Sequence, residues 1–326
     1  MSDLPKSVSI CEEGPREGFQ SEARMLATAD KVRFIEALAE TGVHEINCVS
    51  FVNPKRVPQM ADADAVAAGI RRRPGVRYTP TFLNLAGFER ARASGLDLEP
   101  VLFLSASETF GIRNSNKDRA AALVEQRAFL AAYQAAGLVP AAGYVFTAFG
   151  CAYESDVAPA VVVGAVAQLL ELTAGLPVPR IVLCDTVGWA TPLAVERLIG
   201  ALRERWADLP LGLHLHDTRG LGIANAMAGL RLGVDHFDSS CGGLGGCPFA
   251  GNAAAAGNIA TEELVQMCAE MGVSTGIDLD RMIDCVALAE DIVGHALPSK
   301  VAKAGSIGAR RARNNAARLA NSAASA

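Results

Sequence analysis

The chain has 326 residues, of which 50% are hydrophobic and 20% are charged, and its formal net charge at pH 7 is −5. This composition excludes an intrinsically disordered chain, and the negative charge argues against a nucleic-acid-binding protein. No apolar run approaches the roughly 18 to 20 residues that a membrane helix needs, and the first ten residues are too polar for a signal peptide. The eight cysteines are scattered without C-x-x-C spacing, which predicts reduced thiols in a cytoplasmic protein.

Short apolar segments alternate with amphipathic segments along most of the chain. Apolar residues recur at helical spacing over residues 30–40, and Thr191 followed by Pro192 predicts the start of a helix over residues 193–206. A further helix is predicted over residues 261–271. Several apolar segments are nearly continuous, as expected for parallel strands buried on both faces. The eight predicted strands cover residues 8–13, 43–51, 77–83, 100–105, 140–147, 180–185, 211–216 and 236–240.

Eight alternating strand and helix units predict a closed (β/α)₈ TIM barrel, as a single domain over residues 5–303. An open doubly wound sheet is the alternative, but residues 13–18 lack the G-x-G-x-x-G turn typical of that architecture. Residues 304–326 are rich in Ala, Arg, Asn and Ser. This composition predicts a basic tail that is solvated or frayed, and its arginines leave open a role in binding an acidic ligand or partner.

Polar residues at the carboxyl ends of barrel strands are candidates for catalysis. His214 and His216 are two residues apart on a predicted strand, so both point to one face and form half of a divalent-metal site. Two packed core histidines are the alternative. Asp217 would point to the opposite face, where it could orient a ligand. After the first strand, Arg16 and Glu17 offer an anion stabiliser and a metal ligand, or a simple surface ion pair.

Four glycines surround Cys241 and Cys247 after the eighth strand, and they predict a mobile loop at the barrel mouth. Loops in this position close over active sites and exclude water during the reaction. Cys247 is therefore a candidate reactive thiol, or else a small filler in a tight turn. Asn258 precedes the helix predicted from residue 261, and it is a candidate cap, turn residue or oxygen ligand.

Eight short motifs occur in an order that resembles one enzyme family. They are EGPREGFQ at 13–20, SFVNPKRVPQM at 50–60, SASETF at 105–110, GCAYE at 150–154, DTVG at 185–188, HLHDT at 214–218, GGLGGCP at 242–248 and GNIATE at 257–262. From about residue 8 to residue 303 the chain resembles the hydroxymethylglutaryl-CoA lyases, within a metallolyase superfamily of barrels that includes isopropylmalate synthases. The VPQM and GGCP motifs belong to the lyase branch, whereas the H-x-H strand is shared across the superfamily.

The resemblance implies a metal site and an anion-stabilising arginine. Glu17, His214, His216 and Asn258 would hold a divalent cation, Mg²⁺ or Mn²⁺, and Arg16 would stabilise the enolate of the departing acetyl-CoA at the thioester carbonyl. A metal on the substrate hydroxyl makes its proton easier to lose, and a fixed guanidinium stabilises the developing oxyanion. The implied reaction cleaves 3-hydroxy-3-methylglutaryl-CoA to acetyl-CoA and acetoacetate.

The same resemblance implies further roles and an assembly. Asp185 would lie near the substrate hydroxyl, Cys247 would lie on the loop that covers the site, and Lys300 and Lys303 would lie near the bound CoA. The general base stays open between Asp185, His214 and solvent. The family tends to be dimeric, so a homodimer is expected, with an acyl-CoA thioester as substrate and neither nucleic acid nor membrane as partner.

The chain departs from the family pattern at four places. Glu17 replaces an Asp, Asn47 replaces a Glu on the second strand, Phe146 replaces a small residue, and two extra residues separate Cys247 from Asn258. These changes keep a related 3-hydroxyacyl-CoA, citramalyl-like or longer-branched, open as the substrate. A non-catalytic barrel that binds acyl-CoA is the alternative from another class. A synthase of the isopropylmalate type is less favoured, because such enzymes carry additional carboxyl-terminal domains.

Overall fold

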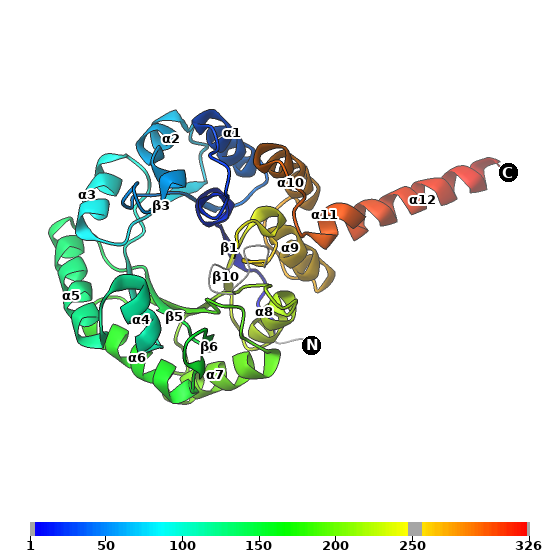
Figure 1. Cartoon of the computed structure of the whole chain (residues 1–326). Coiled ribbons are helices and arrows are strands. Elements are labelled where there is room, and N and C mark those ends of the chain that lie inside the picture. Colours follow the sequence, from blue (N-terminus) through cyan, green and yellow to red (C-terminus); the bar gives the residue numbers. More distant parts are fainter. Residues whose placement is uncertain (1–3, 247–255, 325–326) are drawn as a thin grey trace.

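The computed structural model describes residues 4–246 and 256–324. Eight parallel strands form one curled sheet, and a ring of helices surrounds it in the view along the barrel axis (Figure 1). The chain is therefore a (β/α)₈ TIM barrel, as the alternation of segments predicted. The strands of this sheet are β1 (Ser9–Glu12), β2 (Glu45–Ser50), β3 (Arg77–Thr81), β4 (Val101–Ser105), β5 (Ala142–Phe146), β8 (Arg180–Cys184), β9 (Leu211–His214) and β10 (His236–Ser239).

All eight predicted strands are confirmed, with ends that differ by at most two residues from the prediction. The hydrogen-bonded order of the sheet is β3-β2-β1-β10-β9-β8-β5-β4, so that β3 and β4 are its two ends. At the candidate site, the main difference from the prediction is that β9 ends at His214, whereas the predicted strand continued to residue 216. His216 lies beyond the strand and forms an isolated antiparallel bridge with Asn258.

The helices follow the strands in sequence and cover the outside of the sheet (Figure 1). The predicted helix starting after Thr191 is confirmed as α7, and the Thr191 side chain accepts a hydrogen bond from the Ala194 amide at 3.2 Å. The remaining elements are η1 (Gly14–Gly18), α1 (Thr28–Ala39), η2 (Pro58–Met60), α2 (Ala63–Gly69), α3 (Leu85–Ala93), α4 (Glu108–Ser115), α5 (Arg119–Ala135), β6 (Gly150–Cys151), β7 (Ser155–Asp156), α6 (Pro159–Leu172), α7 (Pro192–Arg205), α8 (Gly222–Arg231), η3 (Cys241–Gly243), α9 (Thr261–Glu270), α10 (Leu279–Val293), α11 (Lys300–Ala304) and α12 (Ile307–Ala324).

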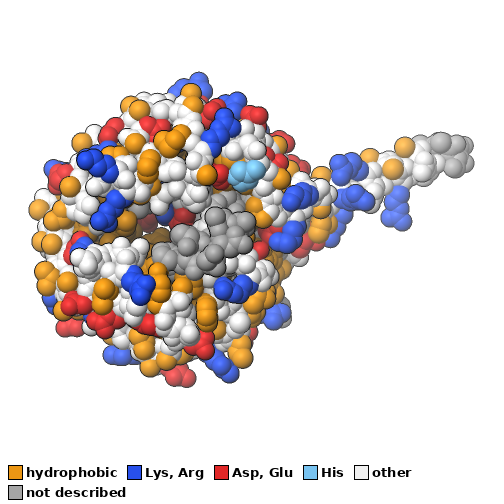
Figure 2. Space-filling model, in the orientation of Figure 1, with side chains coloured by type: hydrophobic (Ala, Val, Ile, Leu, Met, Phe, Trp, Pro, Cys, Tyr) orange, Lys and Arg blue, Asp and Glu red, His pale blue; other side chains and the backbone are white. Residues whose placement is uncertain are grey.

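The two faces of the sheet have different chemistry. On β8, Ile181 and Leu183 belong to the main hydrophobic core, whereas Val182 and Cys184 belong to a separate small cluster. Because successive side chains of a strand point to opposite faces, this split separates the layer between sheet and helices from the barrel interior. The mouth of the barrel is hollowed in the space-filling view (Figure 2), where the carboxyl ends of the strands meet.

Residues 307–324, which the composition predicted as a solvated tail, form helix α12, and it extends away from the barrel (Figure 1). Its side chains are exposed from Arg310 onward, as far as they are described, and basic side chains lie along it (Figure 2). Near its start Arg311 pairs with Glu270 of α9 at 2.7 Å. Neither α12 nor any other helix in the described ranges has the length and apolarity to cross a membrane.

A buried carboxyl group, Glu12, joins the end of β1 to the start of α9. Its Oε1 accepts hydrogen bonds from the amides of Gly14 (2.9 Å) and Cys241 (2.8 Å), and its Oε2 accepts one from the Thr261 hydroxyl at 2.6 Å. Burial raises the pKa of Glu12 to about 8, although these three donors oppose the shift. The folded protein therefore keeps a proton on Glu12 at pH values where the unfolded chain has lost it.

We expect Glu12→Gln to reduce the pH dependence of stability. Below pH 4.5 both states of the wild type carry this proton, and between pH 4.5 and 8 only the folded state does, so stability falls as pH rises through that range. The glutamine Oε1 can still accept from the amides of Gly14 and Cys241, and its Nε2 can donate to the Thr261 hydroxyl oxygen, as a protonated carboxyl would. From pH 6 to pH 8 the wild type should lose about 2 kcal/mol more of its unfolding free energy than the variant.

Urea unfolding at several pH values measures this difference, with Glu196→Gln on the exposed surface of α7 as the matched control. A parallel pH dependence of the wild type and Glu12→Gln would show that Glu12 is already ionised in the folded protein.

Candidate metal centre at the barrel mouth

A single tight turn brings Arg16 and Glu17 over the end of β1. Residues Gly14–Gly18 form a short π-helical turn with Pro15 in its first positions. A side chain at Gly14 would place its Cβ 2.7 Å from Glu12 Oε1, and one at Gly18 would place its Cβ 2.7 Å from the Leu244 Cβ. The two glycines therefore allow the turn to pack closely against its neighbours. Short π-helical turns are frequent at functional sites.

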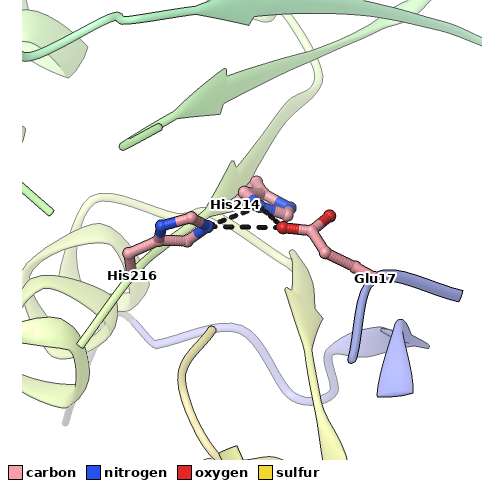
Figure 3. Close-up of side chains that lie close together, drawn as sticks. All are labelled: Glu17, His214 and His216. Carbon is pink, nitrogen blue, oxygen red and sulfur yellow. Dashed lines mark hydrogen bonds and ion pairs between the residues drawn. The ribbon is translucent and has the colours of Figure 1, made fainter. Parts of the chain in front are cut away.

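Glu17, His214 and His216 converge on one point (Figure 3). Glu17 Oε1 lies 3.6 Å from Nε2 of His214 and 3.5 Å from Nε2 of His216, and the two Nε2 atoms are 3.3 Å apart. One potential ligand atom from each residue lies within 4.8 Å of the others. The structure thus brings together the histidine pair and the carboxylate that sequence analysis selected, in a group that could hold a metal ion.

Asn258, the fourth predicted ligand, lies next to this group. Its backbone forms the bridge with His216, and its side-chain Nδ2 donates to the Leu244 carbonyl at 3.5 Å. The side chain is buried, and its Oδ1 has no hydrogen-bond partner among the described residues. A buried amide oxygen without a donor is costly, and a cation would satisfy it. The donor set therefore fits a divalent metal.

Asp238 orients His214, and sequence analysis did not identify it. Its Oδ2 lies 3.1 Å from His214 Nδ1, and its Oδ1 lies 3.2 Å from His236 Nε2. This contact directs Nε2 of His214 toward Glu17, as carboxylate partners of metal-binding histidines do. The sequence feature that could have identified Asp238 is its spacing of two residues from His236 on β10. Its contact with His214 follows only from the pairing of β10 with β9, which places Asp238 opposite His214.

Asp217, which sequence analysis considered for this orienting role, binds elsewhere. Its Oδ1 accepts a hydrogen bond from the amide of Gly222 at 2.8 Å, and its Oδ2 lies 3.6 Å from Lys300 Nζ. As predicted, its side chain diverges from the histidine pair, because neighbouring residues on an extended segment point in opposite directions. Asp217 therefore positions the start of α8 and not the histidines.

The charges in the group depend strongly on one another. Burial alone would raise the pKa of Glu17, but the positive charges of Arg16 and His214 lower it well below its usual value. Burial alone would lower the pKa of His214, but the Glu17 carboxylate and the hydrogen bond to Asp238 raise it well above its usual value. The pocket thus has the electrostatic environment of a cation site.

Arg16 lies between two carboxylates. Its Nη2 is 2.6 Å from Glu13 Oε2 and its Nη1 is 2.8 Å from Glu17 Oε2, while its buried Nε has no hydrogen-bond partner in the described part of the chain. Asn47 approaches from β2, and its Nδ2 donates to Glu13 Oε1 at 3.2 Å. Burial raises the pKa of Glu13 to about 7, although the charge of Arg16 opposes this shift.

The other predicted site residues are placed as follows. Asp185 is buried after β8; its Oδ1 accepts from the amides of Trp189 (2.7 Å) and Ala190 (3.1 Å), and its Oδ2 has no hydrogen-bond partner within the described ranges. Burial raises the pKa of Asp185. Lys300 and Lys303 lie on α11, and Lys300 Nζ is 3.6 Å from Glu263 Oε1. Cys247 lies outside the described residues.

These features define a class of protein: a (β/α)₈ barrel enzyme with a candidate metal centre, built from strand ends, beside a partly buried arginine. The chain belongs to the HMGL-like family, whose family model matches residues 7–288.

Curated relatives carry the same family name. The chain is 39% identical over 296 residues to hydroxymethylglutaryl-CoA lyase YngG of Bacillus subtilis, a match that covers 91% of this chain and 96% of that protein. It is 38% identical over 304 residues to the mitochondrial hydroxymethylglutaryl-CoA lyase of Homo sapiens, covering 93% and 91% of the two chains. A crystal structure of the HMG-CoA lyase of Bacillus subtilis matches with a TM-score of 0.86 at 38% identity, over 93% of this chain and 99% of that chain.

A further solved structure contains ligands. It is an HMG-CoA lyase from Acinetobacter baumannii in complex with coenzyme A and 3-methylmalate, with a TM-score of 0.84 at 36% identity, over 94% of this chain and 98% of that chain. The match to these lyases over almost the whole barrel shows that this chain is a carbon–carbon lyase of the same family.

We expect Asp238→Asn to weaken metal binding. Asparagine lacks the negative charge with which Asp238 favours metal binding by His214. It also has only one side-chain oxygen, so one of the two histidine partners faces an NH2 group instead. The dissociation constant for Mn²⁺ should therefore rise by about 10- to 100-fold. Titration of the purified protein with Mn²⁺, followed by electron paramagnetic resonance, measures this constant. Asp235→Asn, an exposed residue three positions earlier, is the matched control. Equal Mn²⁺ affinity in the two variants would contradict the orienting role.

Proposed function

We propose that this protein is a divalent-metal-dependent lyase that cleaves 3-hydroxy-3-methylglutaryl-CoA to acetyl-CoA and acetoacetate. The observation that carries the proposal is the convergence of Glu17, His214 and His216 next to Arg16, in a chain 38–39% identical to curated HMG-CoA lyases over more than nine-tenths of its length. A retro-aldol cleavage of this substrate needs two things: loss of a proton from a tertiary hydroxyl, and stabilisation of an enolate. Both requirements match groups at the barrel mouth.

We propose that Glu17, His214, His216 and the Asn258 amide oxygen hold Mg²⁺ or Mn²⁺. Such an ion, when bound, lowers the pKa of a hydroxyl that coordinates it. Carboxylate and amide oxygens suit Mg²⁺, whereas the two imidazoles favour Mn²⁺ over Mg²⁺. His214 and His216 would hold the ion through Nε2, because these are the atoms that face Glu17.

Arg16 has the geometry to stabilise the enolate. Two carboxylates hold its terminal nitrogens, so the guanidinium needs little reorganisation when charge develops on the thioester oxygen. The substrate hydroxyl loses its proton, the bond between C2 and C3 breaks, and the electron pair moves into the enolate of acetyl-CoA. Asp185 is a candidate to accept the hydroxyl proton, because its buried Oδ2 has no donor in the described chain and burial raises its pKa. We propose that Cys247 acts as the acid that protonates the enolate carbon.

Lys300 and Lys303 are proposed to contact the phosphates of CoA. Both lie on α11, and the Lys300 side chain is 74% exposed, with its ammonium group 3.6 Å from the carboxylates of Asp217 and Glu263. The lyase structure with bound coenzyme A supports a CoA thioester as the substrate class. We further propose a homodimer in the cytoplasm. The seven cysteines that the structure describes are all free and buried, which agrees with a reducing compartment.

A related 3-hydroxyacyl-CoA, citramalyl-like or longer-branched, is the second candidate substrate. Asn47 and Glu17 change the charges around Arg16, and Phe146 places an aromatic ring at the end of β5. A panel of 3-hydroxy-3-alkyl acyl-CoA thioesters, with products identified by mass spectrometry, distinguishes the two. Much slower cleavage of the methylglutaryl thioester than of another panel member would exclude the first candidate.

We expect His214→Ala to abolish cleavage and weaken Mn²⁺ binding. It removes one of the two imidazoles, so acetoacetate formation with Mn²⁺ should fall by more than about 10³-fold, and chelation of the wild type should have a similar effect that added Mn²⁺ reverses. His44→Ala, an exposed histidine on another strand connection, is the matched control. A wild-type protein that binds no Mn²⁺ and cleaves no thioester would support a non-catalytic acyl-CoA-binding barrel.

We expect Arg16→Lys to lower kcat by about 10²- to 10³-fold with a smaller change in KM. Lysine keeps the charge but cannot contact Glu13, Glu17 and a thioester oxygen with one planar group. Steady-state kinetics with HMG-CoA measure both constants, and Arg24→Lys, an exposed residue in the loop before α1, is the control. If Arg16→Lys raised KM alone, Arg16 would bind the ground state and the transition state equally.

A further inference from the structure

Helix α12 extends away from the barrel as an arm (Figure 1). It has 18 residues and is therefore about 27 Å long. Its side chains are exposed from Arg310 onward, as far as they are described, and Leu319, at 71%, is the most exposed large hydrophobic side chain of the described residues. A helix of this length is only marginally stable in water without a packing partner. None of the roles proposed above uses α12, and the matched family model ends before it, at residue 288.

The start of α12 is fixed to α9 and α10 by side-chain contacts. The Ser306 hydroxyl donates to Asp280 Oδ1 at 2.7 Å. The guanidinium of Arg311 donates to both carboxylate oxygens of Glu270, at 2.8 and 2.7 Å. These contacts set the direction of the helix, which leads away from its own barrel (Figure 1). The exposed part of α12 is therefore available to another molecule.

The arm and the two helices at its start have charges of opposite sign. Residues 294–326 contain six Lys and Arg and no Asp or Glu, whereas residues 261–293 contain eight Asp and Glu and one Arg. The basic side chains lie along the arm (Figure 2). Arg310, Arg313 and Arg318 are exposed, and no carboxylate of the described chain pairs with them. This distribution favours a negatively charged partner surface.

The outer face of α10 is such a surface. Asp280, Asp284 and Asp291 are exposed, and their spacings of four and seven residues place them on one side of the helix. Two arginines lie beside this face, Arg33 and Arg281, and both already pair with carboxylates. Because α12 points away from its own barrel, the free arginines of one copy meet this acidic face only in another copy.

We propose that α12 of one copy lies along the acidic face of α10 in a second copy of this chain. A two-fold axis makes the contact twice, because each copy gives one arm and receives one. Two arms of this length bury on the order of 1,000 Å², which reaches the lower limit of a specific interface. The proposal specifies the surface of the homodimer proposed above and does not depend on the lyase chemistry.

A second copy fits the arm better than a membrane or a nucleic acid does. The apolar side of α12 consists of alanines and Leu319, whereas helices that bind lipid surfaces present larger apolar side chains. The net charge of −5 on the whole chain opposes the approach of a polyanion. On α10, the exposed Ala287 lies between Asp284 and Asp291, so Leu319 can make an apolar contact beside the charge pairs.

Sedimentation equilibrium of the purified protein measures the dissociation constant of the dimer. We expect the wild type to dimerise, with a constant that rises at least about tenfold from about 50 to about 500 mM NaCl, because salt screens exposed charge pairs. An arm variant, Arg310→Glu with Arg313→Glu and Arg318→Glu, should raise the constant about 100-fold. Glutamate favours the helix about as well as arginine does, so α12 itself persists. A control with the same change of charge on other exposed helix surfaces carries Arg127→Glu, Arg197→Glu and Arg231→Glu.

A second variant separates a lost contact from misfolding. This face variant, Asp284→Arg with Asp291→Arg, should also dimerise poorly, because its basic arms meet a basic face. In an equimolar mixture with the arm variant, however, each acidic arm meets a basic face and each basic arm meets an acidic face. The two variants should therefore form a mixed dimer whose dissociation constant is within about threefold of the wild-type value. Native mass spectrometry identifies this mixed dimer by its mass.

Three outcomes would overturn the inference: a monomeric wild type, an arm variant that dimerises like its control, or two variants that fail to associate when mixed. An arm variant that dimerises like its control would still leave a homodimer through another surface. A monomeric wild type that co-sediments with phosphatidylglycerol vesicles or duplex DNA, when the arm variant does not, would assign the arm to an anionic surface instead. Thioester cleavage tests the proposed function separately, because the substituted residues lie outside the candidate metal centre.

Discussion

The arrangement at the barrel mouth depends on Arg16, whose guanidinium contacts Glu13 at 2.6 Å and Glu17 at 2.8 Å. The buried carboxylate of Glu13 and the partly buried one of Glu17 would repel one another without this positive charge. With it, Glu17 stays ionised despite burial, because the charges of Arg16 and His214 hold its pKa well below the usual value. Arg16 therefore controls the ionisation and position of the carboxylate that faces the two histidines.

The interior of this barrel is more polar than the layers of branched apolar side chains that usually fill such barrels. Asp238, His214 and His236 are buried there and form a continuous chain of contacts, which ends where the Ser9 hydroxyl lies 2.9 Å from His236 Nδ1. Each member supplies a partner for its neighbour, so the cost of burying the charges is largely compensated. The polar interior thus orients His214 from below, while the apolar residues that stabilise the fold lie between sheet and helices.

Sequence reasoning was most successful where the signal is local. Apolar runs predicted all eight strands, and the two-residue spacing of His214 and His216 predicted their convergence, because the direction of a side chain on an extended segment follows from its parity. The carboxylate of Glu17 could be predicted only as a strand-end residue, since its approach to the histidines depends on a π-helical turn. Asp238 was missed because its role arises from the register of β10 against β9, which a single sequence does not specify.

The structure changes how the two unusual residues near Arg16 are understood. Sequence analysis gave Asn47 and Glu17 as two departures from the family pattern. In the structure the Asn47 amide contacts Glu13, at 3.2 Å, and also the Thr81 hydroxyl at 2.9 Å. A glutamate in place of Asn47 would set a second carboxylate against Glu13, whose pKa burial already raises to about 7. The neutral amide donates a hydrogen bond instead, which stabilises the ionised form of Glu13 and so strengthens its pairing with Arg16. Glu13 and Glu17 thereby both contact the guanidinium of Arg16. The Glu17 side chain, which is longer than the Asp of the family pattern, reaches the histidines from the turn that contains this arginine.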